Sequence, residues 1–268
     1  EELEGVIRML ASDVHREINE ANPIVDARMP SGYRINGVLR NVALNGPSLT
    51  IRKFAESMIT MEELVQRKSL TEECKEDLCA LTECGYNIFI SGGTGSGKTT
   101  FLNALSDFIP KDERIITIED NAELRIKNVP NLVRLEARNA NVEGTGEISI
   151  RDLIKSALRM RPTRIIVGEV RGSEAIDMLQ SLNTGHCGAS SGHSNSPEDM
   201  LSRLETMVLM GMDIPLTAIQ RQIASAIDII IHLGRLRDRS RKLLQIVEVL
   251  GYEDGKIQLQ TLYEFQET

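Results

Sequence analysis

The chain has 268 residues and a formal net charge of −8, and 41% of its residues are hydrophobic. Its length suits one large domain or a compact domain with a smaller one. No apolar run approaches the roughly 20 residues that cross a bilayer, no signal-peptide pattern opens the chain, and the acidic balance argues against a surface dedicated to nucleic acid.

The first residue and the cysteines give two further expectations. The chain begins with Glu1 and not with Met, so we expect a fragment or a processed form of a longer protein. The cysteines have no C-x-x-C spacing, which argues against a structural zinc site and favours reduced thiols in a cytosolic protein. They are Cys74, Cys79, Cys84 and Cys187.

The first 56 residues predict a small α+β domain. Apolar residues recur at helical spacing over residues 3–18, which predicts an amphipathic helix. Short β-like pieces follow, divided by turn signals at Pro30–Gly32, Asn36–Gly37 and Asn45–Pro47. The pieces are Ile24–Val25, Tyr33–Ile35, Val38–Leu39 and Leu49–Ile51. Residues 57–71 are expected to be a linker, in which Thr60 and Glu63 form a capping box that begins a short helix.

Residues 72–268 predict an α/β domain in which strands and helices alternate. Ser149 caps a helix with apolar residues at i, i+3, i+4, i+7 and i+8, and Ser196–Pro197 begins another. The other expected helices cover residues 72–84 and 100–105, and the expected strands cover residues 86–90, 114–118, 131–135, 164–167, 227–233, 242–250 and 256–263. This alternation implies a mostly parallel sheet with helices on both faces.

Residues 92–99 satisfy the phosphate-loop pattern G-x-x-x-x-G-K-[ST] between an expected strand and an expected helix. The glycines let backbone N–H groups converge on phosphate oxygens, and the start of the helix adds further donors. Lys98 would reach the β- and γ-phosphates, and Thr99 would hold Mg²⁺ through its hydroxyl. The sequence therefore predicts a nucleoside triphosphate site, whose contacts are Gly93, Thr94, Gly95, Ser96, Gly97, Lys98, Thr99 and Thr100.

Acidic residues follow two of the expected strands. Glu169 comes after the apolar run 165–167, where a carboxylate would lie beside the Mg²⁺ bound at Thr99. Glu119 and Asp120 follow the strand at residues 114–118. Ligands of open α/β sheets lie outside the carboxyl ends of the strands. Glu119 and Asp120 are therefore candidates to face the γ-phosphate, and one of them would orient the attacking water.

Two further segments carry candidate phosphate-binding groups. Residues 184–196 are rich in small polar residues and contain His186 and His193, which predicts a loop that senses phosphate through an imidazole. Between Asp26 and Lys53 the cations outnumber the acids by five to one. They are Arg28, Arg34, Arg40, Arg52 and Lys53. Arginine suits the charge of a transferring phosphoryl group, so we hypothesise that one or two of these act in the nucleotide site, either in their own subunit or across a subunit boundary.

The order of these elements resembles the secretion ATPase superfamily, which drives type II secretion, type IV pili and type IV secretion. Its Walker A motif, acidic box, atypical Walker B motif and His box match residues 92–99, 119–123, 165–171 and 185–193. Within the superfamily the chain is most similar to the CpaF type, the motor of tight-adherence (Flp) pili. That likeness is carried by Val25–Pro30, Gly46–Phe54, Ala157–Pro162 and Leu201–Met210.

The resemblance covers essentially the whole chain and implies a RecA-like P-loop ATPase domain with a smaller, PAS-like N-terminal α+β domain. It also implies a homo-hexameric ring that hydrolyses ATP with Mg²⁺ and powers assembly of a tight-adherence or type IV-like pilus, with retraction left open. The ring would be cytoplasmic. It would lie at the inner face of the cell membrane, held there peripherally by the inner-membrane proteins of a pilus or secretion platform.

The resemblance also assigns roles to single residues. Lys98 and Thr99 are implied as phosphate and Mg²⁺ ligands, and Glu169 as the Walker B acid that shares the Mg²⁺. Glu119 is implied as the base that orients water, and His193 as the sensor of the γ-phosphate. Arg34 and Arg52 match the N-terminal-domain arginines that approach the phosphates. The His box departs from the usual pattern at Cys187 and at Ser190–Ser191.

Other functions remain as alternatives. The nearest is a type IV secretion or conjugation ATPase of the same superfamily, whereas the tetra-cysteine element of the type II branch is missing. A nucleic-acid translocase is disfavoured because the five Phe and four Tyr, with no Trp, leave little for base stacking. A GTPase or small-molecule kinase is disfavoured because the chain has no Asn-Lys-x-Asp element for guanine.

Overall fold

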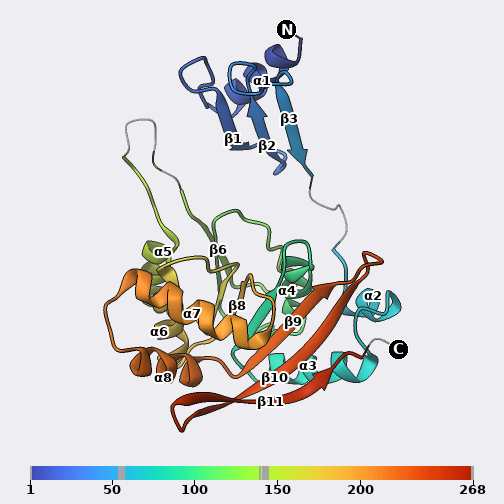
Figure 1. The fold of residues 1–268 in the computed structure, drawn as a ribbon, viewed down its shortest axis with the longest axis vertical. Coiled ribbons are helices and arrows are strands. Elements are labelled where there is room, and N and C mark those ends of the chain that lie inside the picture. Colours follow the sequence, from blue (N-terminus) through green and yellow to red (C-terminus); the bar gives the residue numbers. More distant parts are fainter. Residues whose placement is uncertain (1, 54–57, 139, 141–144, 267–268) are drawn as a thin grey trace. The chain divides into compact units, whose positions relative to one another are not determined.

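The structure is a computed structural model that describes residues 2–53, 58–138, 140 and 145–266 (Figure 1). The chain divides into two compact units, Glu1–Ser57 and Met58–Thr268. In the described part of the chain, no helix has both the length and the apolar character that crossing a membrane requires.

The first unit packs one helix on a three-stranded antiparallel sheet in the order β1-β2-β3 (Figure 1). Its elements are α1 (Glu2–Asp13), β1 (Ile24–Arg28), β2 (Arg34–Val38) and β3 (Ser48–Arg52). Ile7 and Ala11 of the helix are fully buried beside Val25 and Leu39. A Cβ on Gly37 would lie 2.7 Å from the Ile7 side chain, so this glycine lets the helix approach the sheet.

Two predictions for the first unit are wrong. The helix ends at Asp13 and not at residue 18, because His15 has a left-handed φ of 53° and Arg16 N bonds back to Ala11 O at 2.9 Å. Ile18 fits the helical spacing but is buried from the loop that follows. Asn36–Gly37 is not a turn, since both residues lie inside β2 and pair with β1 and β3.

The second unit contains an eight-stranded mixed sheet in the order β11-β10-β9-β4-β8-β7-β5-β6. The strands from β9 to β6 run parallel, and β10 and β11 extend the sheet antiparallel. They are β4 (Ile88–Gly92), β5 (Ile115–Glu119), β6 (Leu132–Glu136), β7 (Arg164–Val167), β8 (Cys187–Gly192), β9 (Ile229–Arg235), β10 (Arg241–Glu253) and β11 (Lys256–Glu264). The predicted α/β class is confirmed.

Helices cover both faces of this sheet (Figure 1). One face carries α5 (Ile150–Ala157), the 3₁₀ turn Leu158–Met160, α6 (Glu174–Asn183), α7 (Pro197–Gly211) and α8 (Leu216–Ala226). The other carries α2 (Met61–Gln66), α3 (Glu72–Glu83) and α4 (Lys98–Ser106). The segment expected as a linker includes α2, whose Met61 and Leu64 are buried in this second core.

Side-chain caps begin four of these helices, three of them at the residues that the sequence marks (Thr60, Ser149 and Ser196) and one at Thr71. The hydroxyl of Thr60 accepts from Glu63 N, and that of Thr71 accepts from Cys74 N, both at 3.2 Å. Ser149 and Asp152 form a full capping box, and Ser196 accepts from Asp199 N. Each cap satisfies an N–H that has no partner inside its helix.

The histidine-containing segment holds a strand and not only the loop expected for residues 184–196. Cys187–Gly192 forms β8 in the middle of the sheet, between β4 and β7. A Cβ on Gly188 would lie 2.4 Å from the Leu182 side chain and 2.6 Å from Ile165 O. The small residues that we interpreted as loop composition therefore allow close packing inside a buried strand.

Candidate active site

The sheet order brings the predicted site residues into one row. Lys98 follows β4, His193 follows β8, Glu169 follows β7, and Glu119 ends β5. These strands are parallel neighbours in the order β4-β8-β7-β5, so their carboxyl ends meet at one edge of the sheet. The order in space is therefore Lys98, His193, Glu169, Glu119, whereas His193 comes last of the four in the chain.

The phosphate loop, residues 92–99, needs glycine for its backbone shape. Gly92, Gly95 and Gly97 have φ values of 152°, 74° and 98°, which L side chains rarely adopt. A Cβ on Gly92 would also lie 2.3 Å from Leu233 O of β9. Gly97 is the N-cap of α4, and its carbonyl accepts from Phe101 N at 2.8 Å. The backbone of this glycine-rich loop, which leads into a helix, can point its N–H groups toward an anion.

The other loop positions differ in exposure. Gly93, Thr94 and Gly95 are exposed, whereas Ser96 is buried and its hydroxyl has no hydrogen-bond partner in the described chain. Thr99 and Thr100 lie in the first turn of α4 and are half-buried. Exposed loop backbone and half-buried threonines leave the loop accessible to a ligand.

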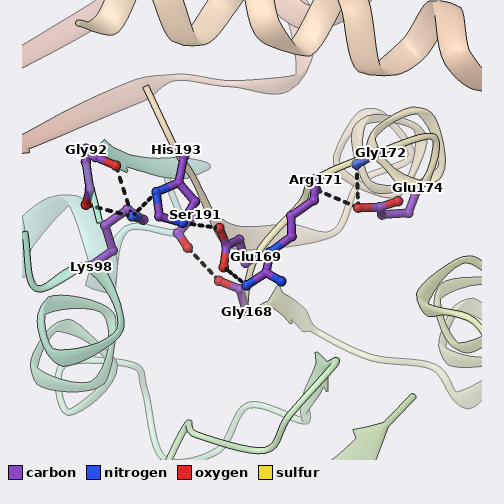
Figure 2. A network of polar contacts seen from close by, with 10 residues as sticks. Gly92, Lys98, Gly168, Glu169, Arg171, Gly172, Glu174, Ser191 and His193 are labelled. Atoms are coloured by element: carbon purple, nitrogen blue, oxygen red, sulfur yellow. Dashed lines mark hydrogen bonds and ion pairs between the residues drawn. The ribbon is translucent and has the colours of Figure 1, made fainter. Parts of the chain in front are cut away.

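Lys98 is buried, and its ammonium folds back onto the loop (Figure 2). Its Nζ donates to Gly92 O at 2.9 Å and to Gly93 O at 3.2 Å, and it lies 3.2 Å from His193 Nδ1. Burial lowers the pKa of Lys98, and Glu169 opposes that shift. The amine is thus a positive charge that three neighbouring acceptors hold at the mouth of the loop.

His193 links Lys98 to Glu169. Its Nε2 lies 2.8 Å from Glu169 Oε1, while its Nδ1 faces Lys98 (Figure 2). Burial and then the nearby Lys98 lower the pKa of His193. A neutral ring with its proton on Nε2 lets Nδ1 accept from the lysine. Glu169 Oε1 lies close to Nε2, but it forms no hydrogen bond with a described residue. Arg171 Nη2 completes the chain by donating to Glu169 Oε2 at 2.7 Å.

Glu119 is buried at the end of β5, while the neighbouring Asp120 is exposed. Glu119 Oε1 accepts from Glu123 N at 2.9 Å and from Leu124 N at 2.8 Å, and Oε2 has no partner among the described residues. Burial raises the pKa of Glu119 to about 7, although these two backbone donors lower it. The carboxyl is therefore close to half-ionised at neutral pH.

Gly168 makes room for Glu119 beside the Walker B strand. A Cβ on Gly168 would lie 2.9 Å from Glu119 Cγ, and the Gly168 carbonyl accepts from Ser191 Oγ at 2.7 Å. The glycine thus touches Glu119 on one strand and Ser191 on another. Because Gly168 directly precedes Glu169, Glu119 packs against the chain immediately before Glu169.

The side chains expected to bind Mg²⁺ carry oxygen atoms, which this ion prefers as ligands. Thr99 and Glu169 offer a hydroxyl and a carboxylate oxygen, and Glu119 Oε2 is an unpaired buried oxygen nearby in the row. Mg²⁺ is usually held by one or two carboxylates together with substrate phosphates. No group of three or more His, Cys, Asp or Glu suited to a metal is found among residues that the structure describes. The set suits a cation shared with a nucleotide better than a closed protein site.

Two arginines that the sequence reasoning missed reach the phosphate loop from the β9–β10 hairpin. Arg241 Nε donates to Gly95 O at 2.8 Å. Arg235 lies opposite Arg241 in the sheet register, and its Nη1 would be 3.9 Å from a Cβ on Gly95. The sequence signal was the run of arginines at 235, 237, 239 and 241, of which the first ends β9 and the last begins β10, with the hairpin turn between them.

Three predicted residues belong to other parts of the fold: Arg34 and Arg52 to the first unit, and His186 to the start of β8. Arg34 and Arg52 are directly opposite each other on β2 and β3 of the first unit. Arg34 forms a bidentate ion pair with Asp26, at 2.9 and 2.7 Å. The role of Arg34 and Arg52 toward a nucleotide stays a prediction. His186 lies 3.3 Å from Thr184 Oγ1 and 3.2 Å from Ser181 O, at the opposite end of β8 from His193.

The chain is similar to several known proteins along most of its length. A putative conjugal transfer protein of Mycobacterium tuberculosis is 36% identical over 271 residues, covering 97% of this chain and 76% of that protein. The crystal structure of the VirB11 ATPase from the Brucella suis type IV secretion system, in complex with sulphate, is 30% identical with a TM-score of 0.60. It covers 92% of this chain and 82% of that one.

A third comparison concerns the fold alone. The pilus retraction motor PilT with bound ADP is 24% identical, with a TM-score of 0.60 over 90% of this chain and 63% of that one. The family model described as "Type II/IV secretion system protein" matches residues 3–261. Nearly the whole chain is thus accounted for, and it belongs to the type II/IV secretion system protein family.

Proposed function

We propose that this chain is an ATP-hydrolysing motor subunit of a type IV secretion or conjugal-transfer machine. The observation that carries the proposal is the continuous contact from Lys98 through His193 to Glu169, with Glu119 packed against Gly168 beside it. These contacts join a phosphate-binding loop to the carboxylates that hydrolysis needs.

Each group has a task that its surroundings support. A γ-phosphate bound by Lys98 would compete with His193 Nδ1 for the same ammonium, so His193 would register whether that phosphate is present. Thr99 and Glu169 would hold Mg²⁺, which when bound neutralises charge on the phosphates. If the γ-phosphate displaced His193 from Lys98, the contact between His193 and Glu169 would also change. The signal would then pass to β7.

Glu119 is the group we assign to the attacking water. Its Oε1 is fixed by two backbone N–H donors, which leaves Oε2 to accept a proton or orient a water. A pKa of about 7 matches a general base that works near neutral pH. Asp120 is exposed, so we favour Glu119 between the two candidates.

The choice of machine rests on the relatives. The curated relative from M. tuberculosis carries the name of a conjugal transfer protein, and the VirB11 ATPase belongs to a type IV secretion system. A CpaF-type pilus motor is the second candidate, supported by the segments Val25–Pro30 and Gly46–Phe54. Deleting the gene in its own organism would separate the two, because one outcome is loss of substrate or DNA transfer and the other is loss of surface pili.

The activity is tested with Lys98→Ala. We expect turnover of ATP to ADP and phosphate to fall by more than about 100-fold, because the β- and γ-phosphates lose their principal cation. Lys111→Ala is the matched control, since it removes an exposed lysine beyond the end of α4. A Lys98→Ala protein that keeps half of the wild-type turnover would refute the proposed site.

We further propose that the working form is a homo-hexamer at the cytoplasmic face of the membrane, bound to the membrane proteins of its secretion system. Light scattering with and without ATP and Mg²⁺ measures the first part. A particle of six chains that needs Lys98 for its stability supports it, and a monomer under every condition contradicts it.

A further inference from the structure

Arg171 contacts the carboxylate to which we assign Mg²⁺, and none of the roles above uses this arginine. Its Nη2 donates to Glu169 Oε2 at 2.7 Å (Figure 2). The other oxygen, Glu169 Oε1, is buried and lies 2.8 Å from His193 Nε2. The side chain of Glu169 is 20% exposed and that of Arg171 is 62% exposed. One carboxylate oxygen is therefore enclosed by protein, whereas the other is paired with a guanidinium that solvent reaches.

The main chain on both sides of Glu169 is held by neighbouring strands. Gly168 N donates to Ile118 O of β5, and Val170 N donates to Ser191 O of β8, both at 2.9 Å. The side chain of Val170 is fully buried in the core on the α6 face of the sheet. The backbone of Glu169 is thus anchored, so a change in what its carboxylate binds has to come from the surrounding side chains.

The main chain of Arg171 is tied to the start of α6. Glu174 Oε1 accepts from Arg171 N at 2.6 Å and from Gly172 N at 2.9 Å (Figure 2). A Cβ on Gly172 would lie 3.2 Å from Glu174 Oε2, so the glycine leaves room for this carboxylate. Exposed side chains change rotamer within nanoseconds. The guanidinium can therefore leave Glu169 while the backbone of Arg171 stays in place.

A guanidinium and a Mg²⁺ ion are alternative partners for Glu169 Oε2. Mg²⁺ binds oxygen at about 2.0–2.1 Å in near-octahedral geometry, which leaves little space for a second cation on the same atom. Two positive charges on one carboxylate oxygen also repel each other. Because Oε1 is buried beside His193, Oε2 is the oxygen left for an incoming ligand. Direct binding of the ion by Glu169 therefore requires the guanidinium of Arg171 to move.

We propose that Arg171 is a positioning residue that holds Glu169 Oε2 in the metal-free site and gives up this oxygen when Mg²⁺ binds with the nucleotide. Arg171 thereby keeps the carboxylate of Glu169 in place, and it also lowers the affinity of the site for the ion. The inference rests on the proposed ATPase function, because Glu169 matters here as the acid that shares the Mg²⁺.

Three substitutions separate this exchange from a general effect of charge. Arg171→Ala removes the guanidinium, and Arg171→Lys keeps a positive charge without its planar pair of donors. The matched control is Arg203→Ala, which removes an exposed arginine of α7. Burial is the main cause of the lowered pKa of His193, and Arg171 and Arg203 both add to it, so either change removes a positive charge that acts on this site.

Glu169→Gln completes a double-mutant cycle with Arg171→Ala. The amide of the glutamine carries no negative charge, so the guanidinium has no carboxylate to withhold from the ion. The effect of Arg171→Ala on metal binding should therefore vanish in the Glu169→Gln chain. This non-additivity is the sign that Arg171 acts through Glu169.

The experiment uses the full chain loaded with ADP and measures its affinity for Mn²⁺, a paramagnetic substitute for Mg²⁺, by electron paramagnetic resonance. We expect Arg171→Ala to bind Mn²⁺ about twofold to fivefold more tightly than the wild type, because exposed ion pairs contribute up to about this factor. The Mg²⁺ concentration that half-saturates ATP turnover should fall by the same factor. Arg171→Lys should lie between the two, and Arg203→Ala should stay close to the wild type.

Other results overturn the proposal. Unchanged or weaker Mn²⁺ binding in Arg171→Ala, an equal gain in Arg203→Ala, or a gain that persists in Glu169→Gln would each show that Arg171 does not compete with the ion for Glu169. If Arg171→Ala does not fold, Arg171→Lys decides, and binding no tighter than wild type contradicts the exchange. A wild-type chain that binds ADP and Mn²⁺ without hydrolysing ATP would refute the proposed function, while the metal affinities would still test Arg171.

Discussion

The two sides of the phosphate-loop strand β4 carry different chemistry. Toward β8, β7 and β5 lie one imidazole and two acids: His193 contacts Glu169, and Glu119 packs against Gly168, the residue before Glu169. Toward β9 and β10 lie Arg235 and Arg241, which are exposed cations beside Gly95. The two sides of the loop are therefore chemically distinct. Groups that can handle a proton gather on one side, and groups that can only offer positive charge gather on the other.

This contrast agrees with the proposed substrate. A nucleoside triphosphate is hydrolysed at its γ end, so that end belongs on the side with the carboxylates. The remaining phosphates and the nucleoside would then extend toward the arginines. Changes on the first side should alter turnover, and changes on the second side should alter binding.

The largest expected effect is on the carboxylate side. Glu119→Gln should lower kcat by about 10²- to 10⁴-fold, the usual contribution of a general base, and leave ATP affinity within a few-fold. A steady-state ATPase assay with equilibrium binding measures both quantities. Asp120→Asn, at the exposed neighbour, should keep most of the turnover. The reverse result would move the water-orienting role to Asp120.

A smaller effect is expected on the arginine side. Arg241→Ala removes the donor to Gly95 O and one cation next to the phosphates, so affinity for ATP and for ADP should fall together by about fivefold to tenfold. The value of kcat should change little. Arg237→Ala, in the exposed hairpin turn, is the control with the same loss of charge. A selective loss of ATP affinity would erase the contrast between the two sides.

The smallest expected effect is a change of stability with pH. The pKa of Glu119 is about 7 in the folded chain and 4.5 in the reference state, so the folded chain binds the proton more tightly. Its stabilisation is complete below pH 4.5 and is lost as pH rises through 7. Between pH 6 and pH 8 the free energy of unfolding should fall by about 1 kcal/mol from this group alone.

Thermal unfolding of the wild type and Glu119→Gln measures this loss. Glu119→Gln should not show this fall in the free energy of unfolding. The difference in melting temperature, variant minus wild type, should therefore rise by about 2–4 °C between pH 6 and pH 8. Asp120→Asn should follow the wild type. Parallel pH curves for Glu119→Gln and the wild type would show that Glu119 is not held in a buried, proton-favouring setting.

Errors in the sequence predictions had local causes. The helix from residue 3 was extended to 18 because Ile18 fits its spacing, yet the residue is buried from a loop. Gly37 and Gly188 suggested a turn and a loop, but each removes a Cβ where another element packs closely. Glycine permits close approach as well as unusual dihedral angles, and a sequence does not distinguish these uses.

The phosphate loop, the acids that follow two strands, three of the helix caps and the α/β class could be predicted from local sequence patterns, because these features depend on neighbours within a few residues. Which strands lie side by side could be seen only in the folded chain. The order β4-β8-β7-β5 puts His193 between Lys98 and Glu169, and β10 brings Arg241 to the loop from 146 positions away in the chain. Sheet order arises from how whole strands and helices bury their apolar faces, so no local pattern records it.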